Sequence, residues 1–233
     1  MQFKNRKHAG ELLAEKLANN SWDKKNTIVI ALPRGGVPVA HEIAKKLQLP
    51  LDIILVKKIG APSYPELAVG TVSEEGEEFY NKNLLIELGY KYSDFDSIKE
   101  QAFIKLQNIG NALRQGHSPL TLTNKDIILV DDGIATGSTI ESVIQILHQR
   151  KVKNIFIAAP VASAESVLKL VKQVKRIFVL ATPDPIYSIG EWYETFLHVE
   201  TDEVIKILQK YSPTKGKTSP LKEFQEASDV PDL

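Results

Sequence analysis

Short apolar runs rich in β-branched residues recur along this 233-residue chain, and segments with helical periodicity separate them. Such runs are typical of strands buried on both faces, and their alternation with helices is typical of a parallel sheet. The pattern predicts an α/β fold, with an open, mostly parallel, Rossmann-like sheet and helices on both of its faces. We expect strands at 27–32, 51–56, 126–130, 154–159 and 176–180, and helices at 8–18, 37–47, 93–115, 138–149, 162–171 and 202–209.

The composition argues against several classes of function. Lys plus Arg number 29, and so do Asp plus Glu. The net charge is therefore zero, which does not favour binding to nucleic acid or to a membrane. There is no cysteine, which excludes disulfides, thiol nucleophiles and Cys-ligated metals. The first residues lack the apolar run of a signal peptide, and no apolar stretch is long enough to span a bilayer. We expect a cytoplasmic protein that binds neither nucleic acid nor membrane.

The chain is predicted to form one domain over 1–211 with two additions. The stretch at about 59–81 is rich in Gly and Pro and breaks the alternation, which predicts a long loop or a two-stranded flap. A turn-rich segment at about 183–211 follows the last strand. The remaining residues, 212–233, are rich in Ser, Pro, Lys and Glu, which predicts a loosely ordered tail.

The most unusual chemistry of the chain lies in the turn after the strand at 126–130, which reads Asp131-Asp132-Gly133-Ile134-Ala135-Thr136-Gly137-Ser138-Thr139. In open α/β sheets, ligands bind at the carboxyl ends of strands. Gly133 and Gly137 let the backbone approach a ligand closely. The N–H groups of a helix start and the hydroxyls of Thr136, Ser138 and Thr139 suit a phosphate. The two carboxylates would repel phosphate, but they suit ribose hydroxyls or a hydrated Mg²⁺. The turn therefore predicts a ribose 5-phosphate site.

Other nucleotide motifs fit this turn poorly. The P-loop pattern needs Gly-Lys-Ser/Thr, but Gly137 is followed directly by Ser138, and the three spaced glycines of dinucleotide sites are absent. A plain structural alternative remains open. In it, Thr136 or Ser138 only caps the helix, while Asp131 and Asp132 only end the strand.

A second anion-binding loop is predicted where the first strand ends. Arg34 can offer a forked donor to phosphate oxygens, and Gly35 and Gly36 expose backbone N–H groups. Lys57 and Lys58 follow the second strand at the same edge of the sheet. Strand alternation sends their side chains to opposite faces, and we favour Lys58 as the one that faces the site. The alternative is a tight turn with a solvated arginine and a solvated pair of lysines.

These segments resemble the type I phosphoribosyltransferases. The acidic pair followed by a Thr-Gly-Ser/Thr loop is similar to the phosphoribosyl pyrophosphate signature of that family. Further segments resemble a group of predicted phosphoribosyltransferases, namely 32–40, 57–62, 65–68 and 192–196. The resemblance covers the chain to about Gln209.

The resemblance implies a transferase that moves the 5-phosphoribosyl group from phosphoribosyl pyrophosphate to a nitrogenous base or related acceptor. It implies Mg²⁺ as cofactor, held by Asp131 and Asp132 through water, and a homodimer. The same two residues would contact the ribose hydroxyls, and Gly133 with 135–139 would hold the 5-phosphate. Arg34, Gly35, Gly36, Lys57 and Lys58 would bind pyrophosphate. Catalysis would be carried by Asp131, Asp132, Arg34 and Lys58. A strained or cis peptide is expected in the pyrophosphate loop, and we place it at the Arg34–Gly35 bond.

Other roles stay open. The resemblance implies that the segment at about 183–211 forms a hood over the site, in which Tyr187 and Trp192 could stack on a nucleobase or close the core. Arg114 and His117 could contact phosphate or only end a helix. In the related enzymes that salvage 6-oxopurines, an Asp stands where this chain has Ala135, which disfavours hypoxanthine or guanine as the acceptor. A regulator that senses phosphoribosyl pyrophosphate without turnover, and an enzyme that cleaves nucleoside monophosphates, are the alternative functions.

Overall fold

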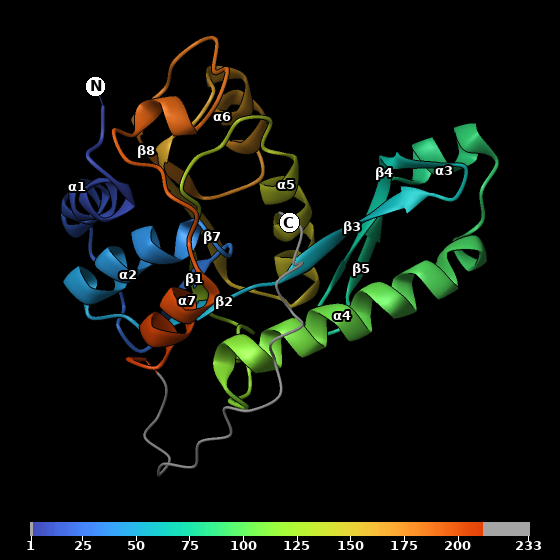
Figure 1. The fold of residues 1–233 in the computed structure, drawn as a ribbon, viewed down its shortest axis with the longest axis horizontal. Helices are drawn as coiled ribbons and strands as arrows, with labels where there is room; N and C mark the ends of the chain where they lie inside the picture. The colour runs from blue at the N-terminus through green and yellow to red at the C-terminus, as the bar shows by residue number, and fades with distance from the viewer. Residues whose placement is uncertain (1, 212–233) are drawn as a thin grey trace.

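The structure, a computed structural model that describes residues 2–211, consists of a sheet-centred body and an arm that projects from it (Figure 1). The body holds a five-stranded sheet in the order β2-β1-β6-β7-β8, and all neighbours are parallel. This confirms the predicted fold class. The strands are β1 (Thr27–Ala31), β2 (Leu51–Ile53), β6 (Asp126–Val130), β7 (Asn154–Val161) and β8 (Arg176–Ala181).

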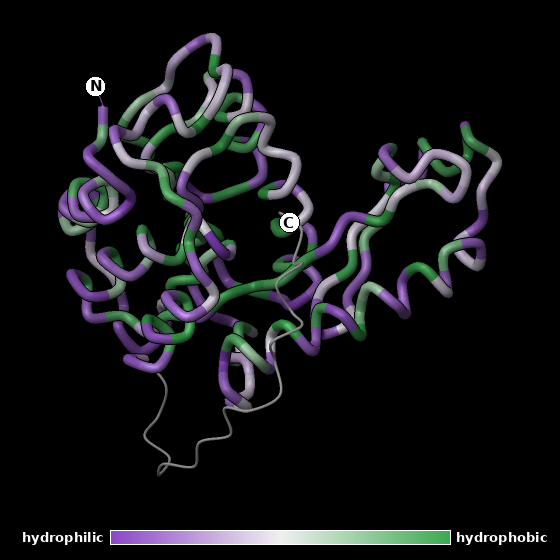
Figure 2. The backbone as a smooth tube through the Cα atoms, viewed as in Figure 1, coloured by the Kyte–Doolittle hydropathy of each residue, from purple (hydrophilic) through white to green (hydrophobic). Residues whose placement is uncertain are grey.

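Helices cover both faces of this sheet. Val29 and Ile128 pack into one core cluster with residues of α1, α2 and α7, whereas Ile28 and Ile127 pack into another with α5 and α6. Successive strand residues point to opposite faces, so both faces need apolar cover. In Figure 2 hydrophobic and hydrophilic stretches alternate along the helices, as this one-sided burial requires. The helices are α1 (Arg6–Ala18), α2 (Gly36–Leu47), α5 (Ser138–Gln149), α6 (Ala164–Leu170) and α7 (Thr201–Leu208).

The arm is larger and more regular than the loop or two-stranded flap predicted for about 59–81. It contains an antiparallel sheet of three strands in the order β3-β4-β5, with helical segments beside it. Gly60 shows why glycines in this stretch need not indicate a loop. A Cβ there would lie 2.0 Å from the carbonyl oxygen of Pro65, so glycine serves close strand contact at an irregular pairing. The elements are β3 (Val56–Ala61), β4 (Tyr64–Ser73), β5 (Glu78–Tyr80), α3 (Lys82–Leu88), η1 (Tyr92–Phe95) and α4 (Asp96–Arg114).

Two predicted boundaries are wrong, one where the body meets the arm and one within the arm. The single strand expected at 51–56 is divided, because β2 ends at Ile53 and the chain then leaves the body sheet to start β3 at Val56. The helix expected from 93 starts at Asp96, since Tyr92–Phe95 form a 3₁₀ turn. The predicted tail at 212–233 lies outside the described residues. Within 2–211, no helix is both long and apolar enough to cross a membrane.

A buried cluster around Arg114 fixes the base of the arm to the body. Its Nε lies 2.7 Å from Oδ1 of Asp52 in β2, and its Nη1 lies 2.6 Å from Oε2 of Glu74, which follows β4. Its Nη2 donates to the carbonyl of Ile53 over 2.8 Å. All three charged side chains are at most 8% exposed. Arg114 is thus committed to the fold, and its alternative role as a phosphate contact is wrong.

Candidate functional site

The two predicted anion-binding loops lie side by side at the carboxyl edge of the body sheet. β1 and β6 are neighbours with Ala31 opposite Val130, so the turns that follow them start next to each other. A Cβ on Gly35 would lie 2.0 Å from Oδ2 of Asp132, and a Cβ on Gly36 would lie 2.7 Å from the carbonyl oxygen of Val130. Glycine at these two positions therefore lets one loop pack directly against the other.

The loop after β1 contains a cis peptide, but one bond earlier than predicted. The Pro33–Arg34 bond is cis, and the prediction for Arg34–Gly35 is wrong. Arg34 lies in the turn before α2, and its carbonyl accepts a hydrogen bond from the N–H of Val37 over 3.2 Å. Gly35, the N-cap residue of α2, already has helical φ and ψ angles of −59° and −37°. The predicted bond therefore leads directly into the helix.

The start of α5 is only weakly capped. Gly137, with φ at +72°, is the N-cap residue and has no side chain, while Oγ1 of Thr136 accepts the N–H of Ser138 over a long 3.4 Å. The plain alternative, in which Thr136 or Ser138 caps the helix, is therefore met only by this one contact of Thr136. The N–H groups of a weakly capped helix start suit an anion.

The backbone before α5 is held from the side of α6. The carbonyl oxygen of Ala135 accepts hydrogen bonds from Oγ of Ser163 and of Ser166, both over 2.7 Å. In a planar trans peptide, this turns the N–H of Thr136 away from α6. The hydroxyls of Thr136 and Ser138 lie 3.1 Å apart, so the predicted phosphate loop presents clustered donors. Sequence reasoning missed the two supporting serines, since nothing in their own segment marks them.

The acid pair at the end of β6 is held unequally. Oδ1 of Asp131 accepts the N–H of Asp132 over 2.9 Å, while Oδ2 of Asp132 lies 2.6 Å from Nε of Arg6. Tyr193 donates its hydroxyl to the carbonyl of Asp132 over 2.5 Å. Burial, together with the charge of Asp132, raises the pKa of Asp131 well above its ordinary value. Two adjacent carboxylates that repel each other in this way favour a ligand that donates hydrogen bonds or carries positive charge.

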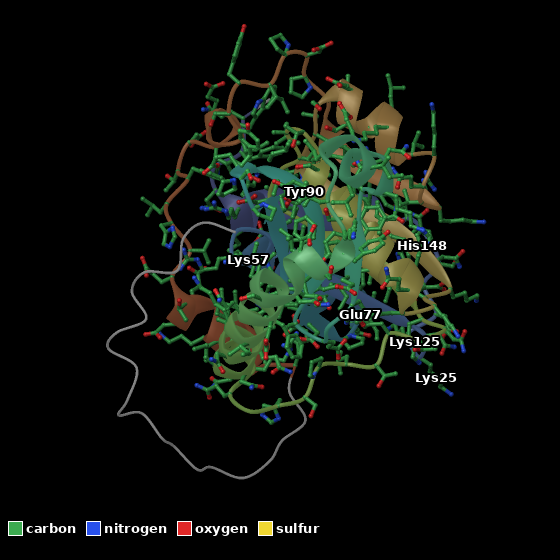
Figure 3. The ribbon with its side chains drawn as sticks, turned by 90° about the vertical axis from the view of Figure 1, so that its right-hand side faces the viewer. Lys25, Lys57, Glu77, Tyr90, Lys125 and His148 are labelled. Carbon is green, nitrogen blue, oxygen red and sulfur yellow. The ribbon has the colours of Figure 1, made fainter. Side chains whose placement is uncertain are left out.

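Of the two predicted lysines, Lys58 lies at the site. Its Nζ donates over 2.8 Å to Oγ of Ser138, the first residue of α5, so it contacts the predicted phosphate loop, and its predicted pyrophosphate role stays a prediction. Lys57 points to the other side of β3, as strand alternation requires. Figure 3 shows Lys57 on the flank of the arm opposite His148 of α5. The structure therefore does not bring Lys57 to the other site residues.

The hood covers the acid pair from one side. Ile189 packs so closely on Gly133 that a Cβ there would lie 2.3 Å from its side chain. Trp192 packs against a small cluster that includes Phe3 and Tyr193, so of its two alternatives the structure shows core packing. Tyr187 is 84% exposed and contributes nothing to the core. It stays a candidate for contact with an acceptor.

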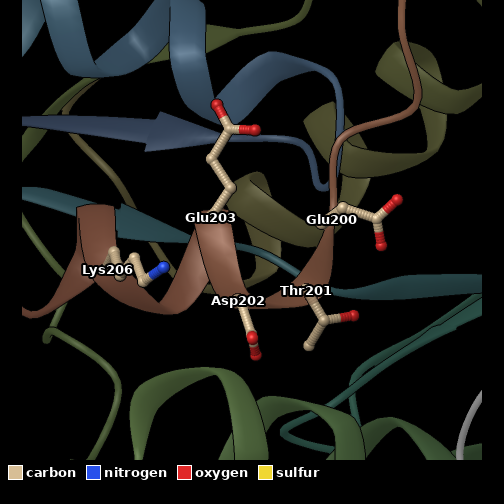
Figure 4. A pocket seen from close by; sticks show the side chains of 5 residues that line it. All are labelled: Glu200, Thr201, Asp202, Glu203 and Lys206. Atoms are coloured by element: carbon tan, nitrogen blue, oxygen red, sulfur yellow. The ribbon is translucent and has the colours of Figure 1, made fainter.

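A second group of acidic residues gathers elsewhere, at the start of α7. Glu200, Asp202 and Glu203 line a shallow hollow with Thr201 and Lys206. Their carboxylates point in three different directions (Figure 4), so they do not converge on one ion. Residues 2–211 contain no group of three or more His, Cys, Asp or Glu that could hold a metal. A metal at the sheet edge would need ligand or water oxygens in addition to the acid pair.

Comparison with known proteins agrees with this geometry. Residues 2–190 match the family model described as phosphoribosyl transferase domain. Proteins of two Mycobacterium tuberculosis strains, each named "Putative phosphoribosyl transferase", are 35% identical over 208 residues. The match covers 89% of this chain but only 46% of each relative, so the chain spans about half of their length. The crystal structure of TT1426 from Thermus thermophilus is 34% identical, with a TM-score of 0.81, and the match covers 91% of this chain and 100% of that one. The chain belongs to the type I phosphoribosyltransferase family.

Proposed function

We propose that this protein transfers the 5-phosphoribosyl group of phosphoribosyl pyrophosphate to a nitrogen acceptor and releases pyrophosphate. One observation carries the proposal. A weakly capped helix start, a repelling acid pair and a second glycine loop are packed together at one edge of the sheet. Phosphoribosyl pyrophosphate has an anion, a diol and a second anion in the same succession.

The 5-phosphate would bind at the start of α5. The N–H groups of the helix start and the helix dipole stabilise negative charge there, and Thr136, Ser138 and Thr139 add hydroxyl donors. The ammonium of Lys58, 2.8 Å from Oγ of Ser138, adds a positive charge to this loop. In this assignment Lys58 serves the 5-phosphate and not the pyrophosphate. Ile189 fills the space beside the Cα of Gly133, so we assign this glycine no contact with the sugar.

The ribose and the pyrophosphate would bind on the acid pair and on the loop after β1. Asp131 and Asp132 accept hydrogen bonds from the two ribose hydroxyls. The loop of Arg34, Gly35 and Gly36 would receive the pyrophosphate, with the guanidinium stabilising the charge that develops as it leaves. Because this chemistry is charge stabilisation and positioning, it needs no covalent nucleophile.

A magnesium ion fits this site as a partner of the substrate. Carboxylate oxygens are ligands that Mg²⁺ prefers, and it keeps several waters or phosphate oxygens in its shell. Asp131 and Asp132 would hold it through water, and the ion would neutralise charge on the departing pyrophosphate. The raised pKa of Asp131 supports this assignment, because a cation beside the pair would relieve the repulsion between the two carboxylates.

The acceptor would lie under the hood. Ile189 on Gly133 shields one side of the acid pair, which keeps water from a reactive sugar carbon. Exposed Tyr187 could stack on a planar base. Ala135 offers no side-chain partner for a base, so we disfavour hypoxanthine and guanine as acceptors.

Release of pyrophosphate tests the proposal. Purified protein with Mg²⁺ and phosphoribosyl pyrophosphate should release pyrophosphate when one member of a panel of purine, pyrimidine and pyridine bases is added. The matched control is Asp132→Asn, which keeps the shape of the side chain and should release no pyrophosphate with any base. Binding without release for every base would instead support a sensor, and release from nucleoside monophosphates alone would support a cleaving enzyme. No binding at all would refute the proposal.

A further inference from the structure

Arg6 is a buried cation of the site that its sequence position did not mark. It lies 126 residues from Asp132 in the chain, yet its Nε is 2.6 Å from Oδ2 of that residue, and both side chains are only 13–14% exposed. Its Nη1 donates to the carbonyl of Leu197 over 2.6 Å. Its guanidinium stacks on the ring of Phe196, 3.8 Å from the centroid. The guanidinium of Arg6 thus uses two N–H donors on protein oxygens and one face on an aromatic ring.

The same segment of the hood also holds the backbone of Asp132. Tyr193, whose ring lies 4.9 Å from that of Phe196, donates its hydroxyl to the Asp132 carbonyl. This segment is in turn joined to the chain start, because the N–H of Glu194 donates to the carbonyl of Phe3 over 2.8 Å. The start of α1 and the hood therefore form one support, and Asp132 is the part of the site that it contacts.

The carboxylate of Asp132 has little room beside this support. Its Oδ2, the oxygen that pairs with Arg6, also faces Gly35, where a Cβ would lie only 2.0 Å away. Repulsion from the neighbouring Asp131 acts against this position of the carboxylate, and the ion pair with Arg6 opposes that repulsion. Because Arg6 engages Oδ2, Oδ1 is the oxygen that would serve a ligand.

We infer that Arg6 is a positioning residue that fixes Asp132 for the ribose diol, acting through this carboxylate and not by contact with the phosphate. The inference rests on the proposed function, because it assumes that Asp132 accepts a ribose hydroxyl. A guanidinium suits this role better than an ammonium, since its planar fork can bind the carboxylate and the Leu197 carbonyl while it stacks on Phe196.

The test compares two ligands by calorimetry, namely ribose 5-phosphate, which has the diol, and inorganic phosphate, which does not. Arg6→Ala should weaken ribose 5-phosphate about 10-fold and leave phosphate unchanged, because only the diol uses Asp132. Arg6→Lys should lie between Arg6→Ala and the unmodified chain. The matched control is Lys7→Ala, which removes the same charge from the next residue of α1, where the side chain is 67% exposed. It should leave both affinities unchanged.

A double-mutant cycle separates positioning from a general loss of charge. In a chain that already carries Asp132→Asn, replacing Arg6 by Ala should have no further effect on ribose 5-phosphate. The inference is overturned if Arg6→Ala weakens the binding of both ligands equally. It is also overturned if Arg6→Ala weakens ribose 5-phosphate binding as much in the Asp132→Asn chain as in the unmodified chain. Neither result would refute the proposed function. If the unmodified chain binds neither ligand, the proposed function fails, and this inference fails with it.

Discussion

The base of the arm and the end of β6 both hold carboxylates that are largely shielded from solvent, but only those at the base of the arm are fully compensated by partners. At the base of the arm, Asp52 and Glu74 share Arg114, and backbone N–H groups of Leu55 and Leu120 donate to the remaining oxygens. At the end of β6, Arg6 pairs with Asp132, Asp131 accepts the N–H of Asp132, and the pKa of Asp131 is raised.

This difference separates charges that serve the fold from charges that serve a ligand. A buried carboxylate with all of its partners inside the protein has nothing left to offer a substrate. An acid pair that repels itself costs stability until a ligand arrives, which is the usual state of a functional site. The following experiments are arranged from the largest expected effect to the smallest.

Removing Arg114 should cause the largest effect. Arg114→Ala leaves two buried carboxylates without their partner, which should cost about 3–5 kcal/mol of unfolding free energy. Urea unfolding followed by circular dichroism measures this cost, and hydrogen exchange should show the arm opening first. Lys105→Ala, on the exposed side of the same helix, is the matched control and should change stability little. A loss below about 1 kcal/mol for Arg114→Ala would show that the cluster is not what fixes the arm.

Gly35→Ala should damage the site and spare the fold. The helical φ and ψ of Gly35 suit alanine, but the new Cβ must push the carboxylate of Asp132 away. We expect phosphoribosyl pyrophosphate to bind about 10-fold more weakly, with an unchanged melting temperature. Calorimetry and thermal melting measure the two effects. Unchanged affinity would mean that the position of Asp132 does not matter.

Asp131→Asn should stabilise the unliganded protein. A raised pKa in the folded state means that Asp131 contributes its stability at pH values below its ordinary pKa, and that this stability is lost as the pH rises through the folded value. At neutral pH the charged pair therefore costs free energy, and we expect a gain of about 1 kcal/mol on replacement. The gain should shrink as the pH falls toward the ordinary range of Asp. Lower stability of the variant at pH 7 would contradict this picture of the pair.

Lys58→Met should have the smallest effect. The side chain is exposed, so solvent screens its charge, and we expect inorganic phosphate to bind about three-fold more weakly. Lys57→Met is the matched control, because this neighbour lies on the other flank of the arm and should leave phosphate binding unchanged. Equal effects of the two variants would show that only overall charge matters, and not the contact with Ser138.

The body could be predicted from the sequence because its strands are buried on both faces. β1, β6 and β7 read as apolar runs, and the glycines between strand and helix marked the ligand loops. The arm could not be predicted in the same way. The first five residues of β4 are exposed, and α3 buries only Leu85, so neither element leaves a clear apolar pattern.

Two arginines have roles that the sequence did not indicate, because tertiary contacts determine them. Arg6 reaches Asp132 across 126 residues, and Arg114 reaches Asp52 and Glu74 across 62 and 40. The sequence around Arg114 indicated only a cation near the end of a helix. The role of each arginine depends on which carboxylates the fold brings to it, and no local pattern contains that information.

Calorimetric binding of phosphoribosyl pyrophosphate in the presence of Mg²⁺ tests the central claim most directly. The unmodified chain should bind one equivalent, and a variant that carries Asp131→Asn together with Asp132→Asn should bind at least about 100-fold more weakly while it stays folded. Equal affinity of the two proteins would contradict the assignment of the acid pair to the ribose, and with it the proposed site.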